Sequence, residues 1–340
     1  METASTNIFK ACIKSMRLRT IPLSLAGVIM GIHLASVEGH IQTGTVLTLI
    51  LTTMLLQILS NLSNELGDTL HGTDNDERMG MHYSLQDGQM SISQMKTFIG
   101  TVAVLCCLSG LAMILCSFGT LLAWEPAVLI ILGACAIWAA MHYTLGKNPY
   151  GYHGLGDIFV FIFFGLVATM GAAYVCSHSI SALWIIPAAA FGLWSVAVLN
   201  VNNIRDMKSD AATRSTVAIK LGERNARIYH TLLISFGWVL MLTYTAISAR
   251  SLLEYVYVIM MPLSVIHLKA VWTKTGRALD PMLPMLVLTT FGISLLIVVS
   301  GLHRSYCIAD IISNEARYDT VDHQENDVIE LNVEKYEKGK

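Results

Sequence analysis

Long apolar stretches alternate with short polar segments along most of this chain. Nine of them come close to or exceed the about 20 apolar residues that a helix needs to cross a bilayer core. They lie at residues 20–37, 43–66, 97–118, 124–145, 157–176, 181–203, 230–248, 252–271 and 282–303. The pattern predicts an all-α integral membrane protein with about nine transmembrane helices.

The same pattern divides the chain into three parts. We expect a cytoplasmic N-terminal segment at 1–19, a transmembrane domain at 20–303 and a polar tail at 304–340. The first segment is charged and has no apolar core, unlike a secretory signal peptide. The tail holds nine acids, five bases and few aromatic residues, a composition typical of disorder.

Composition supports the membrane interpretation. Hydrophobic residues make up 54% of the 340 and charged residues only 14%, whereas soluble domains contain about 25% charged residues. The net charge of −2 and the absence of a basic patch give no reason to expect a nucleic-acid partner. None of the seven cysteines has C-x-x-C spacing, so neither a zinc site nor a redox pair is expected.

Lysine and arginine are distributed unequally between the two sides of the membrane. With the N-terminus in the cytoplasm, cytoplasmic segments hold 16 of the 22 Lys and Arg residues, and the outer loops between helices hold only Arg250. The two long loops, 67–96 and 204–229, then lie on the cytoplasmic side. We therefore expect the functional site there.

Two acidic, asparagine-containing clusters lie at the cytoplasmic ends of the second and sixth predicted helices. They read N-L-S-N-E-L-G-D-T-L-H-G-T-D-N-D-E-R at 61–78 and N-V-N-N-I-R-D-M-K-S-D at 200–210. Asn64 and Asp68 are four residues apart, as are Asn202 and Asp206, and Asp206 and Asp210. Residues four apart share one face of a helix. The repeated N-x-x-x-D spacing indicates an internal repeat whose halves face each other.

The clusters have the composition of a magnesium and diphosphate site. Neighbouring carboxylates repel each other unless a cation lies between them. Mg²⁺ prefers oxygen ligands, namely one or two carboxylates, waters and phosphate oxygens. Basic residues close in sequence are candidates for binding the other phosphate oxygens of a diphosphate: Arg205, Lys208, Arg214 and Lys220. The alternative is that these acids and asparagines are helix caps or solvated loop residues.

The first helix contains a G-x-x-x-G motif at Gly27 and Gly31. Small residues at this spacing suit a close approach of two membrane helices.

Four segments between about residues 16 and 300 point to one family. They are R-L-R-T-I-P at 17–22, the run from Asn64 to Gly80, the run from Tyr143 to Gly165, and the run from Asn202 to Gly222. Together they resemble the UbiA superfamily of intramembrane aromatic prenyltransferases. The third segment, with G-L-G-D and F-V-F-I-F-F-G, resembles the branch that uses 1,4-dihydroxy-2-naphthoate in menaquinone synthesis.

The chain also departs from the family pattern. Leu18 and Met81 replace prolines, Glu65 replaces Asp, and Asp157 replaces Glu. Thr213-Arg214-Ser215 stands where the family has Gly-Lys before a threonine, so Arg214 or Lys220 has to supply that basic contact. Gly72 occupies the position of the superfamily's third acid, and Asp74 takes its place in this branch.

The resemblance implies a fold, a reaction and a location. The fold is a UbiA-like bundle with a central cavity open to the cytoplasmic side. The reaction is Mg²⁺-dependent transfer of a polyprenyl group from polyprenyl diphosphate to 1,4-dihydroxy-2-naphthoate, with loss of CO₂ and diphosphate, giving demethylmenaquinol. The protein is then expected to be a multi-pass protein of the bacterial cell (inner) membrane.

The resemblance also implies residue roles. One Mg²⁺ is assigned to Asn64, Asp68 and Asp74, and another to Asp206 and Asp210, with Glu65 and Asn202 as further ligands. Lys147 and Arg205 are candidates for contact with diphosphate, and Asp157 for orienting or deprotonating the aromatic acceptor. The alternatives are that Lys147 is an ordinary positive-inside residue and that Asp157 is the N-cap of the fifth helix.

Two rival functions are compatible with parts of the sequence. The first is another UbiA-type enzyme with a different acceptor, such as 4-hydroxybenzoate, homogentisate, protohaem or a chlorophyll precursor. The second is a transporter, which would require charge near the membrane midplane, whereas the charges here gather at the cytoplasmic helix ends.

Overall fold

The computed structural model describes residues 2–73 and 82–301. The chain forms two compact units, Met1–Ile297 and Val298–Lys340, and of the second unit only the residues up to Gly301 are described. Within these ranges the chain is helical, with connecting loops and no strand. The core and the site both lie in the first unit.

Nine helical spans in the described part of the chain are long and apolar enough to cross a membrane, as predicted. They are Ile8–Glu38, Thr43–Leu70, Ile92–Phe118, Trp124–His142, Gly156–Ser177, Ala182–Arg205, Val217–Ser248, Leu252–Thr273 and Gly276–Gly301. The largest difference is in the seventh span, which begins at Val217 rather than at residue 230. The charged residues before 230 interrupt the apolar pattern, and within this stretch the helix has a kink at Gly222, where φ is 74° and ψ is 163°.

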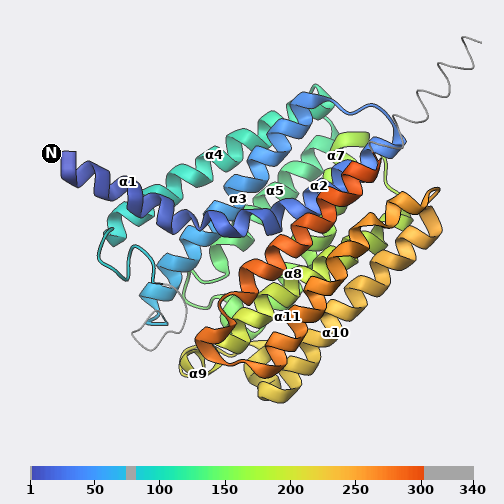
Figure 1. Ribbon diagram of the computed structural model, residues 1–340. Helices are drawn as coiled ribbons and strands as arrows, with labels where there is room; N and C mark the ends of the chain where they lie inside the picture. The colour runs from blue at the N-terminus through green and yellow to red at the C-terminus, as the bar shows by residue number, and fades with distance from the viewer. Residues whose placement is uncertain (1, 74–81, 302–340) are drawn as a thin grey trace, which may run out of the picture. The chain divides into compact units, whose positions relative to one another are not determined.

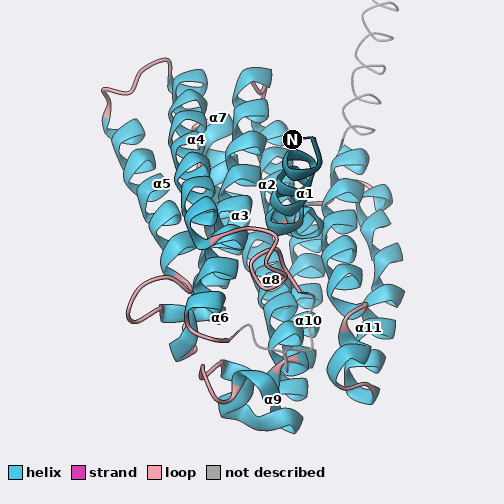
Figure 2. Ribbon diagram, turned by 90° about the vertical axis from the view of Figure 1, so that its left-hand side faces the viewer, coloured by secondary structure: helices cyan, strands magenta, loops and turns pink. Residues whose placement is uncertain are grey.

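The order of the elements can be followed in Figures 1 and 2, and the connection from α3 to α4 is a long one. In chain order they are α1 (Glu2–Met16), η1 (Leu18–Thr20), α2 (Ile21–Glu38), α3 (Thr43–Leu70), α4 (Ile92–Phe118), α5 (Trp124–His142), η2 (Tyr150–His153), α6 (Gly156–Val160), η3 (Phe161–Gly171), α7 (Ala172–Ser177), η4 (Ala182–Trp184), α8 (Ile185–Arg205), α9 (Met207–Asp210), α10 (Val217–Ser248), η5 (Leu252–Met260), α11 (Met261–Thr273) and η6 (Gly276–Leu279), followed by a helix over 282–301. The long helices of the first unit run alongside one another, and α9 lies at one end of them (Figure 2).

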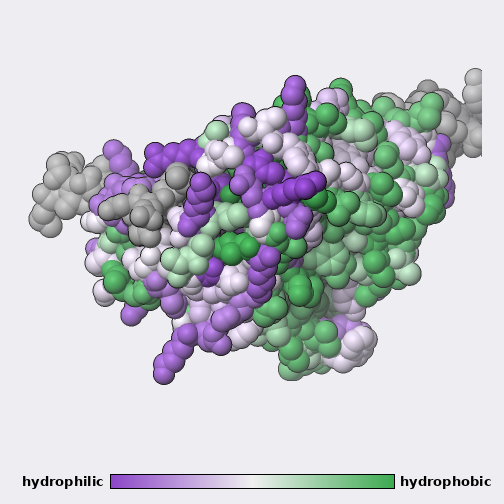
Figure 3. Space-filling view, turned by 90° about the horizontal axis from the view of Figure 1, so that it is seen from below, coloured by the Kyte–Doolittle hydropathy of each residue, from purple (hydrophilic) through white to green (hydrophobic). Residues whose placement is uncertain are grey.

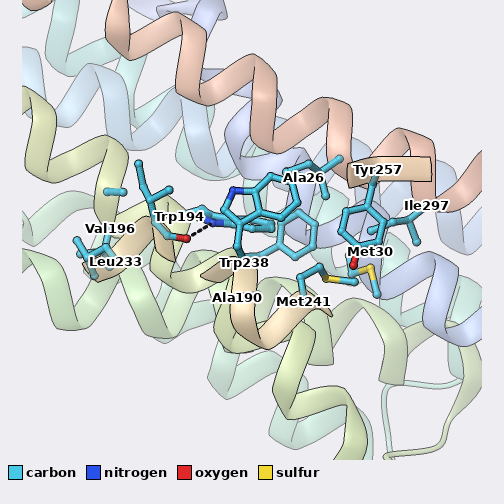
Figure 4. Close-up of a cluster of buried hydrophobic side chains, with 14 of the residues drawn as sticks. Ala26, Met30, Ala190, Trp194, Val196, Leu233, Trp238, Met241, Tyr257 and Ile297 are labelled. Atoms are coloured by element: carbon cyan, nitrogen blue, oxygen red, sulfur yellow. Dashed lines mark hydrogen bonds between the residues drawn. The ribbon is translucent and has the colours of Figure 1, made fainter. Parts of the chain in front are cut away.

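The main core lies between α8, α10 and α2 and contains large aromatic side chains (Figure 4). The indole nitrogen of Trp194 donates a hydrogen bond to the carbonyl oxygen of Ile234, 3.3 Å away. Gly237 faces this ring, because a Cβ at position 237 would lie 2.3 Å from Trp194 Nε1. The two helices therefore approach closely enough for one tryptophan to fill the space between them.

Glycines also bring α2, η3 and α8 into close contact. A Cβ at Gly31 would lie 2.2 Å from the carbonyl oxygen of Thr169, and one at Gly27 would lie 2.7 Å from that of Phe164. Between η3 and α8, a Cβ at Gly165 would lie 2.5 Å from the Cα of Gly192. The predicted close packing at the G-x-x-x-G motif is confirmed.

Candidate functional site

The first acidic cluster lies on the last turns of α3, which continues to Leu70. Asp68 is 4% exposed and accepts a hydrogen bond of 2.8 Å from the hydroxyl of Tyr152. Asn64 is half-buried, and its Oδ1 accepts a hydrogen bond of 3.3 Å from Thr144. The predicted i, i+4 relation of Asn64 and Asp68 on one helix is confirmed. Asp74 lies outside the described residues.

Glu65 is oriented differently from its two neighbours in the cluster. Its Oε1 accepts a hydrogen bond of 2.9 Å from the backbone N–H of Leu85, and the side chain is fully buried. Glu65 thus contacts the 82–90 loop, whereas Asp68 contacts Tyr152. A role for Glu65 as an additional metal ligand stays a prediction.

The second cluster lies at a helix break rather than on one continuous helix. α8 ends at Arg205, and α9 begins at Met207. Asp206, between them, has φ −95° and ψ 7°. Two backbone bonds still cross the break, from the N–H of Asp206 to the carbonyl of Asn202 (3.0 Å) and from that of Asp210 to the carbonyl of Asp206 (2.9 Å). The expectation of one regular helix face is wrong here, but the helical hydrogen-bond spacing persists.

Arg205 forms hydrogen bonds with three side chains in and around the second cluster. Its Nε and Nη2 donate to the two carboxylate oxygens of Asp206, at 2.8 and 2.5 Å. The same guanidinium also donates to Asn202 Oδ1 (2.8 Å) and to Asp280 Oδ1 (2.9 Å). A predicted diphosphate contact and a predicted metal ligand are thus paired with each other, and Asp206 is completely buried.

Arg214 joins the two clusters. Its Nη2 lies 2.8 Å from Asp210 Oδ1, and its Nη1 lies 3.7 Å from Asp68 Oδ1. Burial opposes the charge of Arg214, but Asp68 and Asp210 outweigh it, so the pKa of this guanidinium rises above its usual value. Asp210 keeps one buried oxygen, Oδ2, without a partner, and burial raises the pKa of its carboxyl despite Arg214. The predicted facing of the two clusters is therefore present.

Two tyrosines to which the sequence interpretation gave no role line the space between the clusters. The hydroxyl of Tyr152 contacts Asp68 and also lies 3.1 Å from Thr73 Oγ1. The Arg214 guanidinium lies 5.8 Å from the centre of the Tyr152 ring. Burial raises the pKa of Tyr143 and Tyr152, so both phenols stay protonated at neutral pH. The signal that could have found them is their place in the Y-T-L-G-K-N-P-Y-G-Y run.

Asp157 is a further buried carboxylate, separate from both clusters. It lies in the first turn of α6, is 7% exposed and accepts a hydrogen bond of 3.0 Å from the hydroxyl of Tyr229 on α10. The N-cap of α6 is Leu155, so the alternative that Asp157 caps this helix is wrong. A Cβ at Gly156 would lie 3.0 Å from the Tyr143 hydroxyl. Tyr143 thus adjoins Asp157.

The three predicted lysines lie on the surface. Lys147 follows α5, Lys208 lies on α9 and Lys220 lies near the start of α10, and all three are exposed. The Nζ of Lys220 donates to the carbonyl oxygen of His153, 2.8 Å away. Viewed from below, hydrophilic residues gather on one part of the molecule, while the flank beyond them is hydrophobic (Figure 3).

The side chains present suit Mg²⁺ bound together with phosphate, rather than a site made entirely by the protein. No group of three or more His, Cys, Asp and Glu residues within 2–73 and 82–301 is arranged to hold a metal ion alone. Asp68 and Asp210 instead offer two facing carboxylates, one with an unpartnered buried oxygen. One or two carboxylates completed by waters and phosphate oxygens is the set that Mg²⁺ uses with phosphorylated substrates.

Comparison with known proteins gives a consistent result. The family model described as the UbiA prenyltransferase family matches residues 24–285. The 1,4-dihydroxy-2-naphthoate octaprenyltransferase of Escherichia coli (strain K12) is 40% identical to this chain, over 83% of this chain and 91% of its own length. The protein of the same name from Haemophilus influenzae is 37% identical, over 83% of this chain and 92% of its own length.

Solved structures share the fold. A UbiA homolog from Aeropyrum pernix K1 matches with a TM-score of 0.62 at 14% identity, over 84% of this chain and 97% of the other. A UbiA homolog from Archaeoglobus fulgidus, bound to DMAPP and Mg²⁺, matches with the same TM-score and identity, over 86% and 98%. At this identity the likeness concerns the fold, and it agrees with the predicted UbiA-like bundle.

Proposed function

Because this chain belongs to the UbiA prenyltransferase family, we propose that it transfers a polyprenyl group from polyprenyl diphosphate to 1,4-dihydroxy-2-naphthoate. The product is demethylmenaquinol, and CO₂ and diphosphate are released, which places the reaction in menaquinone biosynthesis. The relatives at 37–40% identity over 83% of this chain support this acceptor. The observation that carries the chemistry is the Arg214 bridge, which gathers Asp68 and Asp210 at one end of the bundle.

The facing carboxylates form the diphosphate-binding half of the site. We assign Asp68 and Asp210 to Mg²⁺, with Asn64 beside them, and we retain Asp74, Asp206 and Asn202 as predicted ligands. Mg²⁺ bound here would neutralise the charge that develops on the leaving diphosphate. Asp68 is held for this role by the Tyr152 hydroxyl and by Arg214, which together fix the direction of its Oδ1.

Basic side chains complete this half of the site. Arg214 lies between two carboxylates with a fork of N–H groups that matches phosphate oxygens. The Arg205 guanidinium donates to Asn202, Asp206 and Asp280, so it acts mainly by orienting Asp206. The exposed Lys147, Lys208 and Lys220 are then candidates for attracting the incoming diphosphate from the aqueous side, although Lys220 also donates to the His153 carbonyl oxygen.

Asp157 serves the aromatic half of the site. Its carboxylate accepts a hydrogen bond from a hydroxyl group of the naphthoate, which directs the ring and increases its electron density. The ring carbon attacks the allylic carbon as the C–O bond to diphosphate breaks. Tyr143, next to Gly156 on one side and near Asp68, Asp210 and Arg214 on the other, separates the acceptor from the diphosphate.

We place the protein in the bacterial cell inner membrane with its N-terminus and site in the cytoplasm. The nine apolar spans of the described chain support a multi-pass membrane protein. The distribution of Lys and Arg in the loops supports the orientation.

One experiment tests the proposal directly. Membranes containing the protein are incubated with labelled polyprenyl diphosphate and a panel of aromatic acids, and the products are identified by mass. We expect a prenylated naphthalenediol that has lost the carboxylate only when 1,4-dihydroxy-2-naphthoate is present. Prenylation of 4-hydroxybenzoate or homogentisate instead would overturn the acceptor, and no prenyl transfer to any acid would overturn the function.

A further inference from the structure

Tyr229 lies outside both acidic clusters, and it contacts Asp157 in the aromatic half of the site. It lies on α10, and its hydroxyl donates a 3.0 Å hydrogen bond to Asp157 Oδ2 across to α6. The two residues are 72 apart in sequence. The contact joins two buried or half-buried polar groups between helices, where an unpaired carboxylate would be costly.

The bond to Tyr229 uses one oxygen of the Asp157 carboxylate, Oδ2. Among the described residues, the Tyr229 hydroxyl is the side-chain group found donating to this carboxylate. A carboxylate with one oxygen fixed by a phenol presents its other oxygen in a defined direction.

The backbone beside Asp157 is closely packed against an aromatic and an aliphatic side chain. Gly156 has no side chain, and a Cβ there would lie 3.0 Å from the Tyr143 hydroxyl and 3.3 Å from Leu199 Cδ2. The wall beside Asp157 therefore consists of a phenol and an aliphatic side chain held against the backbone of α6. Neither Tyr229 nor Leu199 contributes to the Arg205 or Arg214 ion pairs.

We propose that Tyr229 is a positioning residue for the aromatic acceptor: it fixes the carboxylate of Asp157 so that its other oxygen, Oδ1, receives the acceptor's hydroxyl group. The inference rests on the proposed function, since it assigns Asp157 to that acceptor. Tyr229 acts through Asp157 and does not touch the diphosphate. Its removal therefore affects one substrate and spares the other.

The test is the Tyr229→Phe variant, assayed with both substrates varied. Removing the donor to a charged carboxylate should raise the KM for the naphthoate about tenfold, as expected for one hydrogen bond to a charged group. The KM for polyprenyl diphosphate and the Mg²⁺ concentration for half-maximal activity should stay within about twofold of wild type. An equal rise in both KM values, or a fall in kcat alone, overturns the proposal.

A double-mutant cycle with Asp157→Asn separates positioning from a general structural effect. If Tyr229 acts through Asp157, adding Tyr229→Phe to Asp157→Asn should change the naphthoate KM by less than about twofold. Full additivity of the two changes overturns the proposal. Tyr244→Phe is the matched control, since it removes a phenol from the same helix far along the chain from Asp157, and it should leave both KM values unchanged.

The order of measurement keeps this inference distinct from the proposed function. Wild-type turnover of the naphthoate is measured first, and failure there overturns the proposed acceptor. The cycle is then run with whichever aromatic acid the wild type prenylates. Loss of the acceptor-specific effect on that acid overturns the role of Tyr229, whichever acceptor is correct.

Discussion

The two N-x-x-x-D segments look alike in sequence but differ in structure. On α3, Asn64 and Asp68 lie on a regular helix, and Asp68 contacts a phenol and an arginine from other parts of the chain. At the end of α8 the helix breaks at Asp206, and the adjacent Arg205 binds both oxygens of that carboxylate. The same spacing therefore provides an open carboxylate in one half and a closed ion pair in the other.

This comparison distinguishes carboxylates that are placed to bind a metal ion from a carboxylate whose oxygens are both bound by a neighbouring arginine. Asp68 and Asp210 share one arginine across the two halves, and Asp210 keeps an unpartnered oxygen. Asp206 has both oxygens bound and is fully buried. We expect the open pair to contribute chiefly to catalysis, and the closed pair to contribute to both catalysis and folding.

The largest expected effect comes from removing the divalent cation, on which both acidic clusters are proposed to depend. EDTA should abolish prenyl transfer, and Mg²⁺ added in excess of the chelator should restore it. The measurement is the rate of diphosphate release by detergent-solubilised protein. Transfer that continues undiminished in EDTA would contradict the assignment of both clusters.

Substitution of the open carboxylates should have the next largest effect. Asp68→Asn and Asp210→Asn each remove a charge from the proposed Mg²⁺ site and should lower kcat roughly 10²–10³-fold, the scale seen when an electrostatic contact to the transition state is lost. Initial rates at saturating Mg²⁺ measure it. Asp87→Asn is the control, because Asp87 pairs with Lys14 on a partly exposed loop outside the site, and its variant should keep the wild-type rate.

Breaking the Arg205–Asp206 ion pair should lower the stability of the fold as well as the activity. Asp206→Ala leaves a buried guanidinium without its main partner and should abolish transfer. It should also destabilise the fold by about 3–5 kcal/mol, the usual result of breaking a buried ion pair. Asp280→Ala removes the other carboxylate from Arg205, but that side chain is 39% exposed, so its effect on the unfolding temperature should be small. Equal losses of stability would contradict the comparison.

The smallest expected effect concerns Arg214. In the Arg214→Gln variant, Asp68 and Asp210 face each other without the guanidinium between them. The variant should therefore unfold several degrees below wild type in EDTA and gain more from Mg²⁺ alone. Thermal unfolding with and without Mg²⁺ measures this difference, independently of activity. A Mg²⁺ shift no larger than that of wild type would show that Arg214 does not balance the two carboxylates.

The sequence predicted the features that depend on composition and on local spacing. The nine spans follow from the lengths of the apolar runs, and the contact at Gly31 follows from the motif it belongs to. The facing of Asp68 and Asp210 followed from the repeat. Each of these rests on residues close in sequence or on a pattern that occurs twice.

The helix break at Asp206 and the long-range side-chain contacts of the site could not be predicted from local sequence patterns. The break at Asp206 is invisible in the hydropathy, because residues on both sides of it suit a helix. Tyr152 meets Asp68 over 84 residues, and Tyr229 meets Asp157 over 72. Such contacts depend on how separate helices pack, so a single sequence indicates the polar groups but not their partners.

The glycine contacts of η3 also bear on the route of the lipid tail. At Gly31 and Gly165 the neighbouring backbones leave no room even for one methyl group. An isoprenoid chain several ångströms wide therefore has no passage at these two contacts. Larger residues at either position would displace the neighbouring helices rather than open an exit for the hydrocarbon.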